Sequence, residues 1–195
     1  MLFWKFNYKP LDDEIPWIPF RAQKWLKKYL KPDMKVFEYG SGGSTLFFAR
    51  RVVQVVSVEH NREWFDQVYS AIQQKSITNC RYLLQEPEGE GYNGIYSCTT
   101  KFYRGKSFER YVKTIDEYPD GYFDLVAVDG RARPACMAHA ICKIRPGGYL
   151  LLDNAERKEY NEAKAKLDKL KRIKFYGPGP GLIRPWQAIF WQIER

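Results

Sequence analysis

KVFEYGSGGSTLFF, residues 35–48, is the stretch on which the fold prediction depends. Residues 36–39 have the β-branched and aromatic composition of a strand. The glycine-rich run at 40–43 can adopt backbone angles that side chains forbid, and the pair 44–45 can cap a helix that begins at Leu46. The pattern predicts a strand, a tight turn and a helix. A ligand can approach bare backbone at such a turn, and the helix start offers free N–H groups to an anion.

Strand and helix patterns alternate along most of the chain. This alternation predicts an α/β fold with a doubly wound, mostly parallel seven-stranded sheet and helices on both faces. The last two strands have only a glycine and proline run between them, so we expect an antiparallel C-terminal hairpin at one edge. The predicted strands are residues 35–39, 52–58, 80–84, 123–128, 149–152, 172–176 and 186–193, and the predicted helices are residues 20–30, 46–51, 61–74, 107–117, 134–143 and 155–171.

The 195 residues suit a single domain, with an N-terminal arm and helix at 1–31 and the sheet core at 32–195. Residues 1–19 are rich in aromatic side chains and proline, which predicts an irregular arm packed against the domain, where it could also cover a substrate. Residues 85–106 are too long for a simple connection. Their glycines and tyrosines suit either a mobile lid or an extra hairpin.

Composition restricts the class of protein. No apolar run approaches the roughly 20 residues of a membrane span, and Lys5 interrupts the apolar start before a signal peptide can form, so a cytoplasmic protein is expected. Four scattered cysteines and two histidines indicate neither a zinc site nor a disulfide framework. The net charge of +9 leaves nucleic acid open as a partner, although solvated helix faces account for much of it.

Acidic residues near the glycine turn distinguish between two cofactor classes. Glu59 follows the second strand at the spacing from which a carboxylate reaches a ribose diol. A nicotinamide fingerprint would need a third glycine where Thr45 stands, and Glu38 would repel a pyrophosphate. S-adenosylmethionine carries an ammonium and a sulfonium group and no phosphate, so a nearby carboxylate favours it.

Together these motifs resemble those of the class I S-adenosylmethionine-dependent methyltransferases, over roughly residues 31–195. The glycine turn resembles the first motif, Glu59 the second, and the Arg-Pro-Gly-Gly run at 145–148 the turn before the fifth strand. The resemblance implies a Rossmann-like core in which Glu38 or its neighbours face the methionine, Glu59 the ribose, and Glu86 or a nearby residue the adenine edge. The predicted cofactor-binding residues are Glu38, Gly40, Ser41, Gly42, Ser44, Thr45, Glu59, His60 and Glu86.

A second, partial resemblance concerns the ends of the fourth and fifth strands. Asp129, Asp153 and Asn154 are similar to the residues with which cation-dependent O-methyltransferases hold a metal, and hard cations such as magnesium prefer oxygen ligands. One alternative is that Asp153 or Asn154 caps the following helix while Asp129 accepts backbone or arginine hydrogen bonds. Another is direct catalysis by Asp129. Where that family has a lysine base this chain has Arg131 and Arg133, which make poor bases but can clamp a carboxylate or phosphate, or form salt bridges. The predicted catalytic residues are Asp129 and Arg131.

Three functions remain open at this stage. The leading one is methyl transfer from S-adenosylmethionine to a small-molecule acceptor, with an oxygen nucleophile. The second keeps the cofactor but has RNA as the substrate, which the positive charge favours. The third is a non-catalytic binding module that retains the fold. Enzymes of this fold that methylate the amino groups of bases commonly have an Asn/Asp-Pro-Pro-aromatic motif after the fourth strand. This chain has Asp129-Gly130-Arg131 at that place, which makes a nucleic-acid base less favoured as the acceptor.

Overall fold

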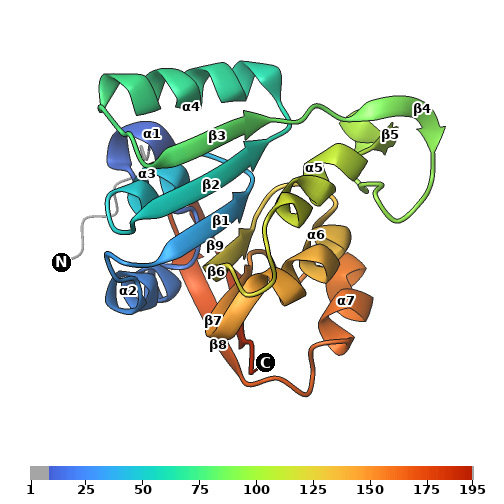
Figure 1. The fold of residues 1–195 in the computed structure, drawn as a ribbon. Helices are drawn as coiled ribbons and strands as arrows, with labels where there is room; N and C mark the ends of the chain where they lie inside the picture. Colours follow the sequence, from blue (N-terminus) through green and yellow to red (C-terminus); the bar gives the residue numbers. More distant parts are fainter. Residues whose placement is uncertain (1–8, 195) are drawn as a thin grey trace.

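A computed structural model of the chain describes residues 9–194, with only the backbone described at positions 182 and 183. The predicted arm residues 1–8 lie outside the described part. Seven strands form one sheet, in which neighbouring strands are mostly parallel (Figure 1). Their order across the sheet is β3 (Cys80–Leu84), β2 (Gln54–Glu59), β1 (Lys35–Tyr39), β6 (Phe123–Val128), β7 (Ile144–Leu152), β9 (Leu182–Gln192) and β8 (Arg172–Gly179).

The strand order reverses next to the glycine turn. β1 pairs in parallel with β2 on one side and with β6 on the other. The chain runs outward from β1 to β3 and then returns to β6, so the switch point lies between β1 and β6. Ligands of open α/β sheets bind outside the carboxyl ends of the strands at such a point. Gly40 and Asp129 therefore flank the expected site.

The C-terminal hairpin is confirmed. β9 lies between β7 and β8 and runs antiparallel to both. The predicted doubly wound sheet with an antiparallel edge is therefore the observed one.

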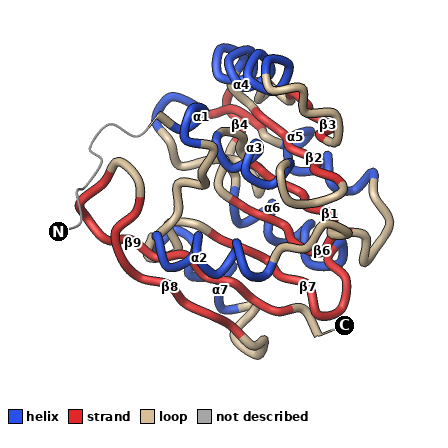
Figure 2. Tube along the Cα trace, turned by 90° about the vertical axis from the view of Figure 1, so that its left-hand side faces the viewer, coloured by secondary structure: helices blue, strands red, loops and turns tan. Residues whose placement is uncertain are grey.

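Both faces of the sheet are buried, which explains why β6 has no exposed residue. Helices α2 (Phe20–Tyr29), α3 (Gly43–Ala49) and α4 (Arg62–Gln74) pack on one face, and α5 (Glu109–Lys113), α6 (Arg133–Ala140) and α7 (Asn161–Ala165) on the other (Figure 2). Successive strand side chains point to opposite faces, so Val36 enters one core and Phe37 the other. No helix of residues 9–194 is long and apolar enough to cross a membrane.

The predicted helix at 155–171 is much shorter in the structure. A 3-10 turn, Lys158–Tyr160, leads into α7, which ends at Ala165. Asn154 adopts a left-handed conformation (φ 48°). The Ala155 N–H then donates to the Gln187 carbonyl of β9 (2.8 Å), and the Ala155 carbonyl accepts from the Lys164 side chain. These tertiary hydrogen bonds replace the first turn of the predicted helix.

Two short strands occupy the ends of the long segment at 85–106. β4 (Glu88–Tyr92) and β5 (Gly105–Ser107) form a separate antiparallel sheet beyond the end of β3 (Figure 1). This arrangement supports the extra-hairpin alternative for the ends of the segment. The residues between the two strands include 95 and 97–100, which line a cavity described below.

Candidate active site

The glycine turn is locked against the end of β6. Gly40 has a φ of +90°, and a Cβ atom there would lie 2.7 Å from the Gly130 Cα. The Gly40 N–H donates to the Val58 carbonyl (2.9 Å), and the Asp129 N–H donates to the Tyr39 carbonyl (3.0 Å). Only glycine fits this position, because the conformation and the space both exclude a side chain. The loops after β1 and β6 therefore form one rigid unit.

Glu38 supports this turn from beneath. Its Oε2 accepts hydrogen bonds from the hydroxyls of Thr45 (2.6 Å) and Ser57 (2.7 Å), and Thr45 Oγ1 also accepts from the Gly42 N–H. Burial raises the pKa of Glu38 to about 7, although the hydroxyls of Ser44, Thr45 and Ser57 oppose the rise. Glu38 and Thr45 are both fully buried inside the fold, so their contact with the cofactor stays a prediction made from the sequence.

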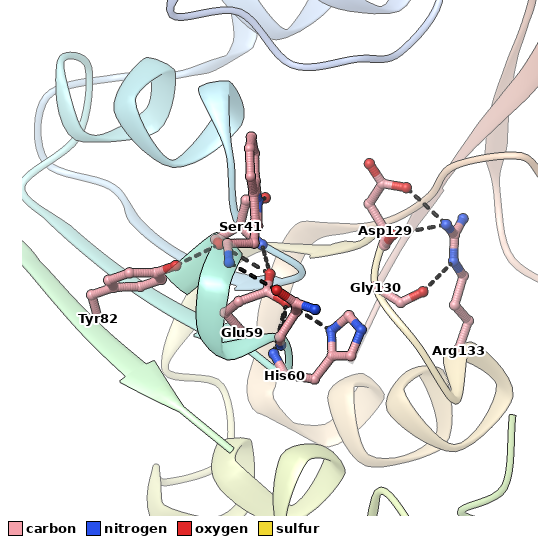
Figure 3. A network of polar contacts seen from close by, with 9 residues as sticks. Ser41, Glu59, His60, Tyr82, Asp129, Gly130 and Arg133 are labelled. Carbon is pink, nitrogen blue, oxygen red and sulfur yellow. Dashed lines mark hydrogen bonds and ion pairs between the residues drawn. The ribbon is translucent and has the colours of Figure 1, made fainter. Parts of the chain in front are cut away.

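Glu59 joins the glycine turn to the end of β2. Its Oε2 accepts from the Ser41 N–H and hydroxyl, both at 3.0 Å, and its Oε1 accepts from the N–H groups of His60 (2.8 Å) and Asn61 (2.9 Å; Figure 3). Burial alone would raise the pKa of Glu59, but hydrogen bonds from His60 and Asn61 hold it below its ordinary value. These four bonds use the roughly four lone pairs of a carboxylate. The Ser41 hydroxyl is the most replaceable partner, because it also lies 2.7 Å from the Tyr82 hydroxyl.

A cavity of about 290 Å³, here called the central cavity, lies over the switch point. Six of the predicted site residues line it together, and the lining adds Asn61, Trp64, Tyr103 and Gly130. Trp64 Nε1 donates to the Ser41 carbonyl (2.9 Å), and the His60 and Tyr103 rings meet edge to face at 5.0 Å. Trp64 could have been predicted as a lining residue from the sequence, because it is an aromatic residue in the first turn of the helix that follows Glu59. The lining residues are Gly40, Ser41, Glu59, His60, Asn61, Trp64, Tyr103, Asp129, Gly130 and Arg131.

A second cavity, the arm cavity, adjoins the first and has a volume of about 320 Å³. The two share Ser41, Trp64 and Asp129. The short helix α1 (Pro10–Asp13) and the residues after it cover the start of α3 so closely that a Cβ at Gly43 would lie 2.1 Å from the Pro10 carbonyl oxygen. The open helix start expected from the sequence is therefore covered by the arm. The lining residues are Pro10, Ile15, Trp17, Ser41, Gly42, Gly43, Ser44, Trp64 and Asp129.

Glu86 does not reach either cavity. Its side chain is half exposed and forms an ion pair with Arg62 at 3.0 Å. The contact of Glu86, or a residue near it, with the adenine edge therefore stays a prediction made from the sequence.

Arg133 contacts Asp129 and Gly130 after the end of β6 (Figure 3) and also reaches Asp153 after the end of β7. Its guanidinium is buried and donates to the carbonyls of Gly130 (3.0 Å), Asp129 (2.7 Å) and Asp153 (2.6 Å), and to Asp129 Oδ1 (2.9 Å). All three guanidinium nitrogens are thus used within the protein. The alternative that Arg133 clamps a substrate is wrong, and the salt-bridge alternative is confirmed.

The residues predicted to bind magnesium do not fit a cation. Asp153 is buried, its Oδ1 accepts from Trp186 Nε1 (2.9 Å), and burial and the nearby Asp129 carboxylate raise its pKa. Within residues 9–194, no three His, Cys, Asp or Glu side chains are grouped as metal ligands. Asn154 lines none of the cavities described. The Arg133 guanidinium supplies a fixed positive charge where a metal was expected.

A third cavity, the outer cavity, has a volume of about 440 Å³ and shares Gly130 and Arg131 with the central cavity. Arg131 Nε is buried and has no hydrogen-bond partner in the described part of the chain. The Arg131 guanidinium lies 5.8 Å from the centre of the Tyr103 ring. The lining residues are Ile95, Ser97, Cys98, Thr99, Thr100, Gly130, Arg131, Ala132, Arg133, Pro134, Arg157, Glu159 and Tyr160.

The same fold occurs in solved methyltransferase structures. An O-methyltransferase from Bacillus cereus in complex with SAH (S-adenosylhomocysteine) is similar at a TM-score of 0.65 and 16% identity, over 97% of this chain and 84% of that one. An rRNA methylase from Streptococcus thermophilus is similar at a TM-score of 0.64 and 12% identity, over 89% of this chain and 95% of that one. A precorrin 8w decarboxylase from Methanobacterium thermoautotrophicum is similar at a TM-score of 0.59 and 16% identity, over 98% of this chain and 99% of that one.

These similarities confirm the predicted class I methyltransferase fold. No protein-family model and no curated protein sequence matches the chain. The identities show the fold alone, and the three similar proteins differ in what they act on, so the fold does not determine the acceptor.

Proposed function

We propose that the protein transfers a methyl group from S-adenosylmethionine to an oxygen nucleophile of a small molecule. The observation that carries the proposal is the turn at Gly40, which is packed on Gly130 at the switch point with Glu59 at the neighbouring strand end. The central cavity would hold the adenosine, and the adjoining arm cavity would receive the methionine. Their shared wall contains Asp129.

The residues of the central cavity fit an adenosine after one change. Ribose hydroxyls would donate to Glu59 in place of the Ser41 hydroxyl, which can turn to Tyr82. The rings of His60 and Tyr103 offer faces and edges to a planar base. Because Glu38 is sequestered, it does not reach the methionine ammonium.

Asp129 is the residue placed to remove a proton from the acceptor. When bound, S-adenosylmethionine supplies an electrophilic methyl carbon. Asp129 Oδ1 accepts from Arg133, whereas the other carboxylate oxygen points away from Arg133 (Figure 3). Desolvation raises the pKa of Asp129, although Arg133, Arg157 and Arg131 oppose the rise. The carboxylate would take the hydroxyl proton as the oxygen attacks, with the reacting groups held in line.

Isothermal titration calorimetry with S-adenosylmethionine and S-adenosylhomocysteine tests the cofactor assignment. Wild type should bind both. Glu59→Ala should bind about tenfold or more weakly, because it removes charge-assisted hydrogen bonds, whereas Glu86→Ala, the change of a surface acid, should bind like wild type. Urea unfolding of each variant separates lost binding from lost folding. Absence of binding to wild type at millimolar concentration would overturn the proposed function.

RNA is the second candidate acceptor, because the net charge is +9 and one similar structure is an rRNA methylase. RNA binding would weaken steeply as salt rises, since binding releases counterions from phosphates. A methyl-transfer screen over small hydroxylated compounds and RNA oligonucleotides at two salt concentrations distinguishes the two acceptors. Bound cofactor with no transfer to any acceptor would instead favour the non-catalytic module.

A further inference from the structure

The outer cavity carries two cationic groups that form no ion pair in the described part of the chain. Arg131 lies where the outer and central cavities join, and Arg157 lines the outer cavity only. Within residues 9–194, neither guanidinium lies within ion-pair distance of a carboxylate. Arg133, which lines the same cavity, differs in having all its nitrogens bonded.

From this arrangement we infer that the outer cavity binds the acceptor through an anionic group, a carboxylate or phosphate, held by Arg131 and Arg157. The inference rests on the proposed methyl transfer and specifies the substrate class of that same site. Guanidinium forks match the oxygen geometry of both anions.

The Arg131 side chain is positioned before any ligand arrives. Its Nε is buried without a partner in the described chain, which is costly unless a ligand or water satisfies it. The Tyr103 ring lies 5.8 Å from the guanidinium and limits its movement. An anion between Arg131 and Arg157 would satisfy this donor and offset the positive charge of the pair.

The charged groups that line the outer cavity are Arg131, Arg133, Arg157 and Glu159, so cationic side chains outnumber the single carboxylate. Arg133 is paired with Asp129 at 2.9 Å. Glu159 Oε1 accepts from the Thr99 hydroxyl (3.2 Å), which joins the two walls of the cavity.

The position of the cavity suits an acceptor whose reacting oxygen reaches Asp129. Arg131 lines the central cavity together with Asp129, so an anion held by Arg131 lies beside the cavity that contains the proposed base. The lining also contains apolar residues, among them Ile95, which is 76% exposed, and Pro134. A volume of about 440 Å³ is in the range of small-ligand sites. The matching acceptor is a small anion with an apolar body.

Phenyl phosphate and benzoate are suitable test ligands, with benzyl alcohol as the neutral counterpart. Each is titrated by calorimetry into wild type with and without S-adenosylhomocysteine. At least one anion should bind, and benzyl alcohol should bind at least about tenfold more weakly. Arg157→Gln should weaken anion binding about tenfold or more and leave S-adenosylhomocysteine binding unchanged. Arg131→Gln should weaken anion binding similarly.

Arg104→Gln is the matched control, because Arg104 is exposed and lines none of the three cavities. It should bind both anions like wild type. Equal anion binding by Arg157→Gln and wild type, or no anion binding with S-adenosylhomocysteine bound, would overturn the inference. Failure of S-adenosylhomocysteine to bind would overturn the proposed function alone, because the titrations without it still report on the anion site. An RNA hexamer that binds where neither small anion does would exclude a small acceptor.

Discussion

Glu38→Gln should stabilise the protein at neutral and alkaline pH. Glu38 is 1% exposed, and burial raises its pKa from the ordinary 4.5 to about 7. Below pH 4.5 the carboxyl is protonated in both the folded and unfolded states. Between 4.5 and about 7 the unfolded carboxyl ionises while the folded one keeps its proton, so the wild-type protein loses stability as pH rises. Above pH 7 the loss is complete and constant.

The magnitude follows from the two pKa values. Each pKa unit corresponds to about 1.4 kcal/mol, so the rise from 4.5 to about 7 costs the folded state about 3 kcal/mol at alkaline pH. Glutamine carries no charge, and its oxygen can still accept from the Thr45 and Ser57 hydroxyls. The stability advantage of the variant should therefore grow by about 2 to 3 kcal/mol between about pH 5 and about pH 8.

Urea unfolding followed by tryptophan fluorescence at several pH values measures this difference. Glu86→Gln is the control, because Glu86 is half exposed and should show no comparable pH-dependent gain. A difference between Glu38→Gln and wild type that stays constant with pH, or a wild type that gains relative stability at high pH, would refute the reasoning. Affinity for S-adenosylmethionine should stay within about threefold of wild type, because Glu38 lines none of the cavities. A large loss of affinity would indicate that Glu38 contacts the cofactor directly, as the sequence predicts.

Three further changes test the rest of the site. Gly40→Ala should cost about 2 to 4 kcal/mol in urea unfolding, because its Cβ would meet the Gly130 backbone, whereas Gly147→Ala, at a similar positive φ with open space around it, should cost about 1 kcal/mol. Arg133→Met should lower stability by about 3 to 5 kcal/mol, since it leaves a carboxylate and three carbonyls without their donor, and a fully stable variant would contradict this. Treatment with EDTA should leave methyl transfer unchanged, because the Arg133 guanidinium stands where a metal was expected, and restoration by magnesium of an activity lost to EDTA would refute that assignment.

The fold was predictable because the deciding features are local. Strands and helices alternate along the chain with mostly short connections, and this alternation predicts a parallel sheet. The apolar composition of β6 fits a strand that is buried on both faces, as β6 is in the structure. The end of the chain was less predictable. The lysine-rich stretch after Asn154 has helical periodicity, yet hydrogen bonds to β9 hold Ala155 outside a helix, and such distant partners leave no local trace in the sequence.

The site was predictable in location but less so in roles. Strand ends at a switch point must meet, so Gly40, Glu59 and Asp129 were brought together as expected. The direction of a side chain at a strand end depends on its neighbours, and the hydroxyls of Thr45 and Ser57 hold Glu38 inside the fold. Spacing along the chain contains no information about such contacts.

Arg133 explains how the ends of β6 and β7 can resemble a metal site without being one. Two acidic residues at adjacent strand ends repel each other, and a cation between the strands removes that repulsion. Arg133 supplies this charge from the first turn of α6 and bonds the backbone carbonyls of Asp129 and Asp153 as well. A guanidinium stays protonated at any physiological pH. The Arg133 guanidinium engages only one carboxylate oxygen of Asp129, so the other oxygen can act as the proposed base. The neighbouring Arg131 lines the same cavity and can bind the acceptor beside that base.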